Sequence, residues 1–134
     1  MSAIAEAFEF APVLLKGNGW RVGWMPERSP YCALVGGNAW AFELTEAEWQ
    51  DLCGGVRSLL ETAQAVGTEL MKEETLTLEH VTDRLRLVST GDVNQPELYL
   101  QLHRGRLAEG SWSVEATSDF MAAVQRLGLK SGAI

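Results

Sequence analysis

The sequence predicts an α+β fold made of two ββββα-like units. Short β-rich segments separated by Gly, Asn and Pro turns are followed by an amphipathic helix, and this order occurs twice in 134 residues. The segment 39–49 reads as a strand end running directly into a helix, and a weaker copy follows 72 residues later at 111–121. Antiparallel hairpins followed by helices are typical of the α+β class.

The length fits a single domain, residues 1–134, with an internal repeat of roughly 7–72 and 75–128. A chain of this length buries roughly two thirds of its unfolded surface, which is enough for a core. The repeat aligns three residue pairs: Trp40 with Trp112, Glu43 with Glu115, and Thr45 with Thr117. We therefore interpret the segment as a structural joint that the fold uses twice.

Four strands are predicted in the first half. They cover residues 6–15, 20–25, 31–35 and 40–44. In the second of these, Trp20, Val22 and Trp24 fall on one face by their period of two, which indicates a strand with one buried side. Five tryptophans on such faces are expected to belong to the core.

A long helix is predicted after these strands. Thr45 and Glu48 have the spacing of a capping box, and an apolar stripe continues to about Leu70. Gly54 and Gly55 in its middle each cost about 0.8–1 kcal/mol relative to Ala. We therefore expect another backbone to approach closely there, either within the chain or from a partner subunit, so a homodimer through this helix stays open.

The second half repeats this order with a shorter helix. The predicted strands are 75–81, 84–89, 97–103 and 107–114, with a loop at 91–96. Thr117 is expected to cap a helix over about 118–127, and Gly128 to end it before a loose tail.

Composition restricts the function classes. Apolar residues are 46%, charged residues are 22%, and the net charge is −7, so general attraction to nucleic acid or anionic membrane is unfavourable. Apolar runs fall below the ~20 residues that span a bilayer. The N-terminus lacks the basic start of a signal peptide. We expect a cytoplasmic protein with no membrane partner.

No motif carries recognisable chemistry. Cys32 and Cys53 fall in apolar settings and read as free buried thiols. His80 and His103 have no metal-ligand spacing and are expected on outward strand positions or near turns. The sequence therefore predicts no enzyme, no metal site and no cofactor.

One candidate binding face combines cationic and aromatic side chains on the outward side of the second sheet. Its residues are Arg84, Arg86, Tyr99, Gln101, His103, Arg104 and Arg106, and Arg21 of the predicted strand 20–25 joins them if it lies nearby. A cationic groove with a stacking ring is the combination that binds single-stranded nucleic acid. The alternative is a solvated sheet face whose charges oppose edge pairing.

Several segments resemble a small family of uncharacterised cyanobacterial proteins. They are 19–24 (Gly-Trp-Arg-Val-Gly-Trp), 34–48 (Leu-Val-Gly-Gly-Asn-Ala-Trp-Ala-Phe-Glu-Leu-Thr-Glu-Ala-Glu), 102–106 (Leu-His-Arg-Gly-Arg) and 109–112 (Glu-Gly-Ser-Trp), within a match of about 15–128. This family is a domain of unknown function without assigned catalytic or binding residues. Its fold is grouped with the Whirly-type single-stranded-DNA-binding transcriptional regulators, so the resemblance implies twisted antiparallel sheets packed on helices, and fold alone does not establish function.

Two hypotheses follow from the sequence. The first is a non-enzymatic cytoplasmic binding or regulatory module that can self-associate, with a protein or nucleic acid as its unidentified partner. The second is a single-stranded nucleic-acid binder that uses the Arg/His/Tyr face.

Overall fold

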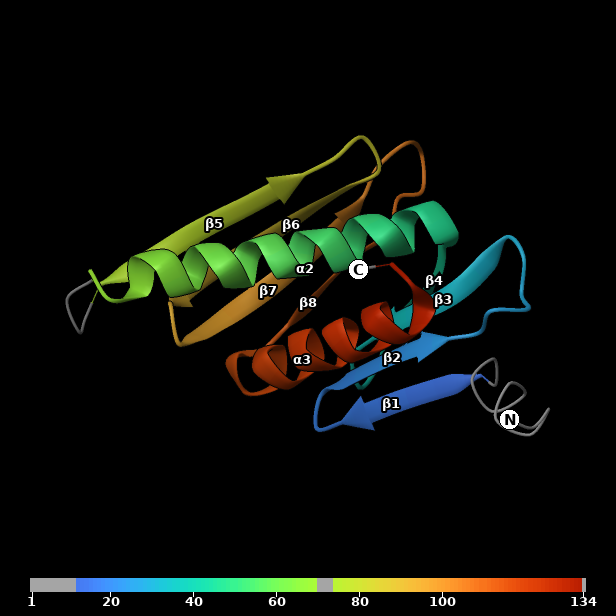
Figure 1. The fold of residues 1–134 in the computed structure, drawn as a ribbon, viewed down its shortest axis with the longest axis horizontal. Coiled ribbons are helices and arrows are strands. Elements are labelled where there is room, and N and C mark those ends of the chain that lie inside the picture. The colour runs from blue at the N-terminus through green and yellow to red at the C-terminus, as the bar shows by residue number, and fades with distance from the viewer. Residues whose placement is uncertain (1–11, 70–73, 134) are drawn as a thin grey trace.

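The computed structural model describes residues 12–69 and 74–133, which form two four-stranded antiparallel sheets and two helices (Figure 1). The first sheet comprises β1 (Val13–Gly17), β2 (Trp20–Trp24), β3 (Tyr31–Gly36) and β4 (Ala41–Thr45), and the helix α2 (Glu46–Gly67) follows it. The second comprises β5 (Thr75–Val81), β6 (Leu85–Asp92), β7 (Gln95–Leu102) and β8 (Glu109–Trp112), followed by α3 (Val114–Ser131). The ββββα order occurs twice, which confirms the predicted α+β class. The part of the predicted strand 6–15 before residue 12 lies outside the described residues.

Each helix packs on both sheets. Helix α2 leaves the first sheet and crosses β5 and β6 of the second, whereas α3 leaves the second sheet and lies over β2 of the first (Figure 1). The inward residues of both sheets therefore join one core with the two helices. Val22 of β2 and Leu87 of β6 are completely buried, which confirms the inward faces that the alternation predicts.

The start of α2 confirms the predicted capping box. The Glu48 amide donates to Thr45 Oγ1 at 3.2 Å, and the Thr45 amide donates to Glu48 Oε1 at 2.9 Å. The second sheet does approach α2 closely at Gly55, but with side chains and not with the backbone that the sequence predicted: a Cβ at Gly55 would lie 2.5 Å from Leu87 and 2.9 Å from His80. Gly54, in contrast, faces open space.

The start of α3 differs from its prediction by four residues. The helix begins at Val114 with Ser113 as its N-cap, whereas Thr117 is buried in the helix. The Thr117 hydroxyl donates to the backbone carbonyls of Trp112 and Ser113. It therefore acts as a donor within the helix rather than as the acceptor that a cap requires.

The end of α3 also differs. The helix passes through the buried Gly128 and ends at Gly132, which adopts the left-handed conformation at φ 78°. Most of the predicted loose tail is therefore the last turn of a helix.

The predicted loop at 91–96 is instead a tight hairpin. Strand β6 continues to Asp92 and β7 begins at Gln95, so only Val93 and Asn94 connect them. Asp92 Oδ1 accepts a hydrogen bond from the Asn94 amide at 2.8 Å. Pro96 is compatible with β7 because β8 pairs only with residues 98–101, so no neighbouring strand needs its missing amide.

Candidate functional site

The predicted binding face is only partly assembled. Arg86, Tyr99 and Gln101 lie together on the outward face of the second sheet, where Arg86 pairs with Gln101 across β6 and β7. Arg86 contacts Glu79 at 2.9 Å, and the Tyr99 hydroxyl donates to Glu109 at 2.7 Å. This hydrogen bond raises the pKa of Tyr99. The centre of the face therefore alternates cationic, aromatic and acidic groups.

Three more candidates lie at the end of the second sheet. Arg84 pairs with Asp51 of α2 at 3.5 Å, and Arg104 pairs with Asp83 at 3.2 Å. The His103 amide donates to the Arg84 carbonyl. Each of these guanidinium groups thus has a carboxylate partner.

Arg21 and Arg106 do not join this face. Arg21 belongs to β2 of the first sheet, where its guanidinium donates to the carbonyls of Gly37 and Trp40 at 3.0 Å each. Its role there is to satisfy backbone acceptors of the β3–β4 connection. Arg21 is therefore apart from the predicted face, in the first sheet where its strand was expected.

Arg106 secures the start of α2. From the β7–β8 loop it reaches Glu48 with two hydrogen bonds, Nε to Oε2 at 3.0 Å and Nη2 to Oε1 at 3.1 Å. It also donates to the Glu43 carbonyl and lies over the Tyr31 ring, 4.9 Å from its centroid. Because Glu48 is only 5% exposed, this bidentate pair compensates a buried carboxylate.

The thiols and histidines do not form a reactive centre. Burial raises the pKa of Cys53 to about 12, and burial followed by the negative charge of Glu46 raises the pKa of Cys32. Both thiols are therefore protonated at neutral pH. His80 was expected on an outward strand position or near a turn; it lies near the end of β5, with its ring directed inward next to Gly55 of α2. Within residues 12–69 and 74–133, no group of three metal-ligating side chains is present.

The two helices run antiparallel and meet closely at one end, which we call the closed end. Trp49, in the first turns of α2, is fully buried, and its Nε1 donates to Ser131 Oγ at the end of α3 at 3.0 Å. The Trp49 ring also stacks on Trp24 of the first sheet, with centroids 5.9 Å apart. Trp24, Trp49 and Ser131 thereby join both helices to the first sheet.

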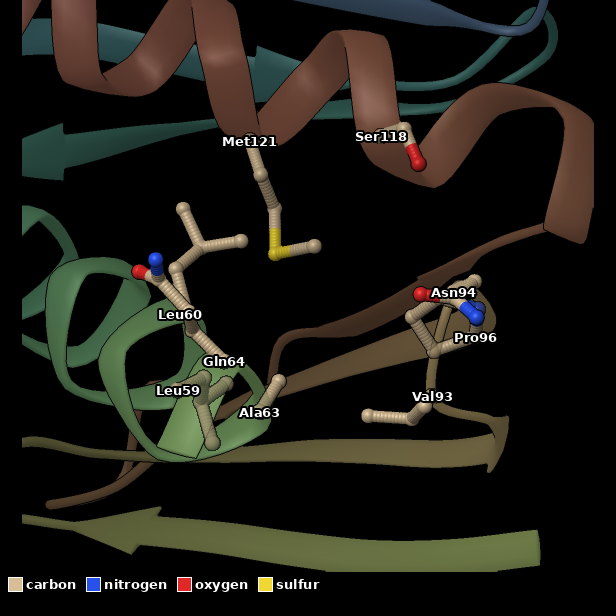
Figure 2. Close-up of a pocket in the computed structure, with 9 residues that line it drawn as sticks. All are labelled: Leu59, Leu60, Ala63, Gln64, Val93, Asn94, Pro96, Ser118 and Met121. Carbon is tan, nitrogen blue, oxygen red and sulfur yellow. The ribbon is translucent and has the colours of Figure 1, made fainter. Parts of the chain in front are cut away.

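At the opposite end, the open end, the helices leave a pocket of about 400 Å³ (Figure 2). Side chains from α2, α3 and the β6–β7 hairpin line it: Leu59, Leu60, Ala63, Gln64, Val93, Asn94, Pro96, Ser118 and Met121. Figure 2 shows Met121 descending from α3 toward Leu60 of α2. The hairpin is held beside α2 by Val93, whose methyl groups lie next to Gly67.

The side chains that line this pocket are all uncharged. None of the nine described residues that line it is ionisable, although the protein carries a net charge of −7. Gln64, Asn94 and Ser118 supply neutral hydrogen-bonding groups around an apolar floor. The arrangement fits a small, uncharged and mainly apolar molecule, since such sites combine apolar walls with a few polar groups.

Sequence reasoning did not find this pocket. It assigned Leu59, Leu60, Ala63 and Met121 to helix stripes that form the core, and Leu59 and Met121 are indeed buried. No local pattern signalled the pocket, because its walls come from α2, α3 and the β6–β7 hairpin, which only the fold brings together.

The family follows from a comparison with known domains. A family model described as "Domain of unknown function (DUF1818)" matches residues 15–127. The chain belongs to this family. This result agrees with the predicted resemblance to a domain of unknown function. A comparison with curated proteins found no match to the chain.

A solved structure shows the same fold as this DUF1818 chain. It is a protein of unknown function from the DUF155 family of Prochlorococcus sp. NATL2A, similar with a TM-score of 0.80 and 29% identity. The similarity covers 86% of this chain and 98% of that one. This relative comes from a cyanobacterium, as the sequence resemblance led us to expect, and the Whirly-type grouping stays a prediction. No helix in the described part of the chain is long and apolar enough to cross a bilayer.

Proposed function

We propose that the protein is a non-enzymatic cytoplasmic binding module whose ligand site is the pocket at the open end of the helix pair. The observation that carries this proposal is the pocket itself, with its volume of about 400 Å³ and its lining free of ionisable side chains. Ligand pockets for small molecules typically measure roughly 300–1,000 Å³.

The lining determines the class of ligand. Leu60, Ala63 and Met121 offer apolar contact, and Gln64 with Asn94 offers both donors and acceptors. A charged ligand would lose hydration there without meeting an opposite charge. The proposed ligand is therefore neutral, with an apolar body and one or two amide, hydroxyl or carbonyl groups.

A binding experiment with a neutral apolar probe tests this proposal. N-phenyl-1-naphthylamine should increase its emission with the protein, and Ala63→Phe should abolish the increase because the ring fills the pocket. Ala65→Phe is the matched control, since Ala65 is exposed on the same helix and does not line the pocket. Binding that survives Ala63→Phe, or an absence of binding to the unaltered protein, would refute the site.

The second candidate function is single-stranded nucleic-acid binding on the outward face of the second sheet, within a Whirly-type grouping. Its support is that Arg86, Tyr99 and Gln101 share that face. Arg86 and Tyr99 both engage carboxylates, so a nucleic acid would have to replace Glu79 and Glu109 as their partners. This exchange lowers the affinity that the arginine could supply.

Titration of labelled single-stranded oligonucleotides at several salt concentrations separates the two functions. A binder should lose affinity linearly in log salt, and Arg86→Ala should flatten the slope. Binding without such dependence, or no binding at low salt, would exclude this candidate and leave the pocket proposal unaffected.

A further inference from the structure

Strand β5 forms an edge of the second sheet and lies at the margin of the molecule, beyond α2 (Figure 1). Among the described residues, β6 is the only strand that pairs with it. Its seven residues, Thr-Leu-Thr-Leu-Glu-His-Val, contain no Pro or Lys, and the pairing with β6 is regular without a bulge. Proline, lysine and bulges are among the devices by which proteins block sheet edges, and β5 lacks these three.

The register shows which backbone groups face outward. The Thr82 amide donates to the Leu85 carbonyl, directly beyond the Val81–Arg86 pair. Because hydrogen-bonded pairs alternate along an antiparallel ladder, the even-numbered residues of β5 point toward β6. The amides and carbonyls of Thr75, Thr77, Glu79 and Val81 consequently point away from the sheet.

The other edges are shorter or occupied. Strand β8 has four residues and β1 has five, including the exposed Lys16. On β4, Arg106 already occupies the Glu43 carbonyl. The longest edge is therefore also the one without a blocking feature.

The sequence of β5 is complementary to itself. In an antiparallel pair centred on Leu78, Thr75 faces Val81 and Thr77 faces Glu79 of the second copy, so all four outward-pointing residues form hydrogen-bonded pairs. Leu78 then faces its own copy on the inner side. No two like charges stand opposite each other, which would otherwise oppose pairing.

From this complementarity we propose that the protein forms a two-fold symmetric dimer by pairing β5 with β5 of a second copy. The two sheets then become one continuous eight-stranded sheet. Because α2 packs on the inner side of β5 and β6, the two-fold axis places both α2 helices on the same side of that sheet. The dimer uses backbone groups of the edge, not the close helix contact at Gly54 and Gly55 that the sequence suggested.

Blocking the edge tests the dimer. Thr77→Pro removes only an outward-pointing amide, and Pro is tolerated at such edge positions. Sedimentation equilibrium at micromolar concentrations should give a dimer mass for the unaltered protein and half that mass for Thr77→Pro. Ser111→Pro is the matched control: the Leu102 amide donates to Ala108, so by the same alternation Ser111 points to the free side of β8. It should leave the mass unchanged.

A cross-linking pair tests the register without relying on folding of the proline variant. Leu78→Cys should form a disulfide between copies under oxidation, because the Cα atoms of a non-hydrogen-bonded pair lie about 4.5 Å apart. Leu76→Cys should not, because His80 stands opposite it in the proposed register. A monomeric unaltered protein, a dimeric Thr77→Pro variant, or equal cross-linking of both cysteine variants would overturn the proposal.

Discussion

The two ends of the helix pair differ in how they are held. At the closed end, Trp49 is buried, donates a hydrogen bond to Ser131, and directly follows Glu48 of the Glu48–Arg106 pair. At the open end, Leu60 and Ala63 of α2 are only half-buried, and a pocket separates them from Ser118. Two antiparallel helices thus have one end fixed by specific contacts and one end that leaves room for another molecule.

The helix starts follow the same division. Helix α2 begins at the closed end with a complete capping box and two acidic residues in its first turn. Helix α3 begins toward the open end, and its N-cap Ser113 makes no side-chain cap hydrogen bond. Burial compensates there, since Trp112 stacks on Phe120 with centroids 3.9 Å apart. The first joint therefore has a side-chain cap, whereas the second is held by the packing of Trp112 and by the hydrogen bonds that the Thr117 hydroxyl donates to backbone carbonyls.

Truncation of one buried or half-buried side chain at each end to Ala should give the largest difference in the free energy of unfolding. Trp49→Ala should lower the free energy of unfolding by about 3–5 kcal/mol, because it removes a fully buried ring. Leu60→Ala at the open end should cost only about 1 kcal/mol, because its side chain is already partly exposed. Urea unfolding of both variants measures this, and equal losses would contradict a difference between the ends.

Removing the Arg106 guanidinium should have the next largest effect. Arg106→Met keeps much of the side-chain volume but leaves the buried Glu48 carboxylate without its charge partner, so we expect a loss of about 2 kcal/mol. Arg57→Met is the matched control. Its pair with Glu61 is exposed, and its loss should stay below about 0.5 kcal/mol. Similar losses in both variants would show that Arg106 does not secure the joint.

Substitution of the two N-cap residues should change the free energy of unfolding by smaller amounts. Thr45→Ala removes a cap hydrogen bond and should cost about 1 kcal/mol in urea unfolding. Ser113→Ala removes no such bond, so its cost should stay near zero on the same scale. A larger loss for Ser113→Ala than for Thr45→Ala would contradict the assignment of the side-chain cap to α2 alone.

Much of the architecture could be predicted from local patterns. The alternation in 20–24 and the capping box at Thr45 and Glu48 each depend on neighbours in sequence, and the structure confirms both. The α+β order of elements follows from the same patterns.

The repeat alignment was less accurate because similar residues serve different roles in its two copies. Trp40 and Trp112, which were aligned as equivalents and contact each other at 5.1 Å between centroids, differ in position, because Trp40 precedes β4 whereas Trp112 ends β8. The true caps are Thr45 and Ser113, so the second helix starts four residues earlier than the alignment places it. A hydroxyl at Thr117 can cap or donate backward, and only tertiary packing decides between these.

The candidate site depended most on long-range contacts. Arg106 and Glu48 are 58 residues apart, and no local pattern links them. The same holds for the pocket, whose walls come from α2, α3 and the β6–β7 hairpin. The sequence analysis placed the arginines on one face because of their residue type. In the structure they instead contact different carboxylates and backbone carbonyls.

The most direct test of the account is an amide-resolved titration with N-phenyl-1-naphthylamine. In ¹H–¹⁵N spectra we expect shifts concentrated at the open end, on Ala63, Val93, Asn94 and Ser118, with Trp49 and Ser131 at the closed end unchanged. Chemical shift changes that are absent from the open end, or that are equal at both ends, would contradict a ligand site in the pocket at the open end.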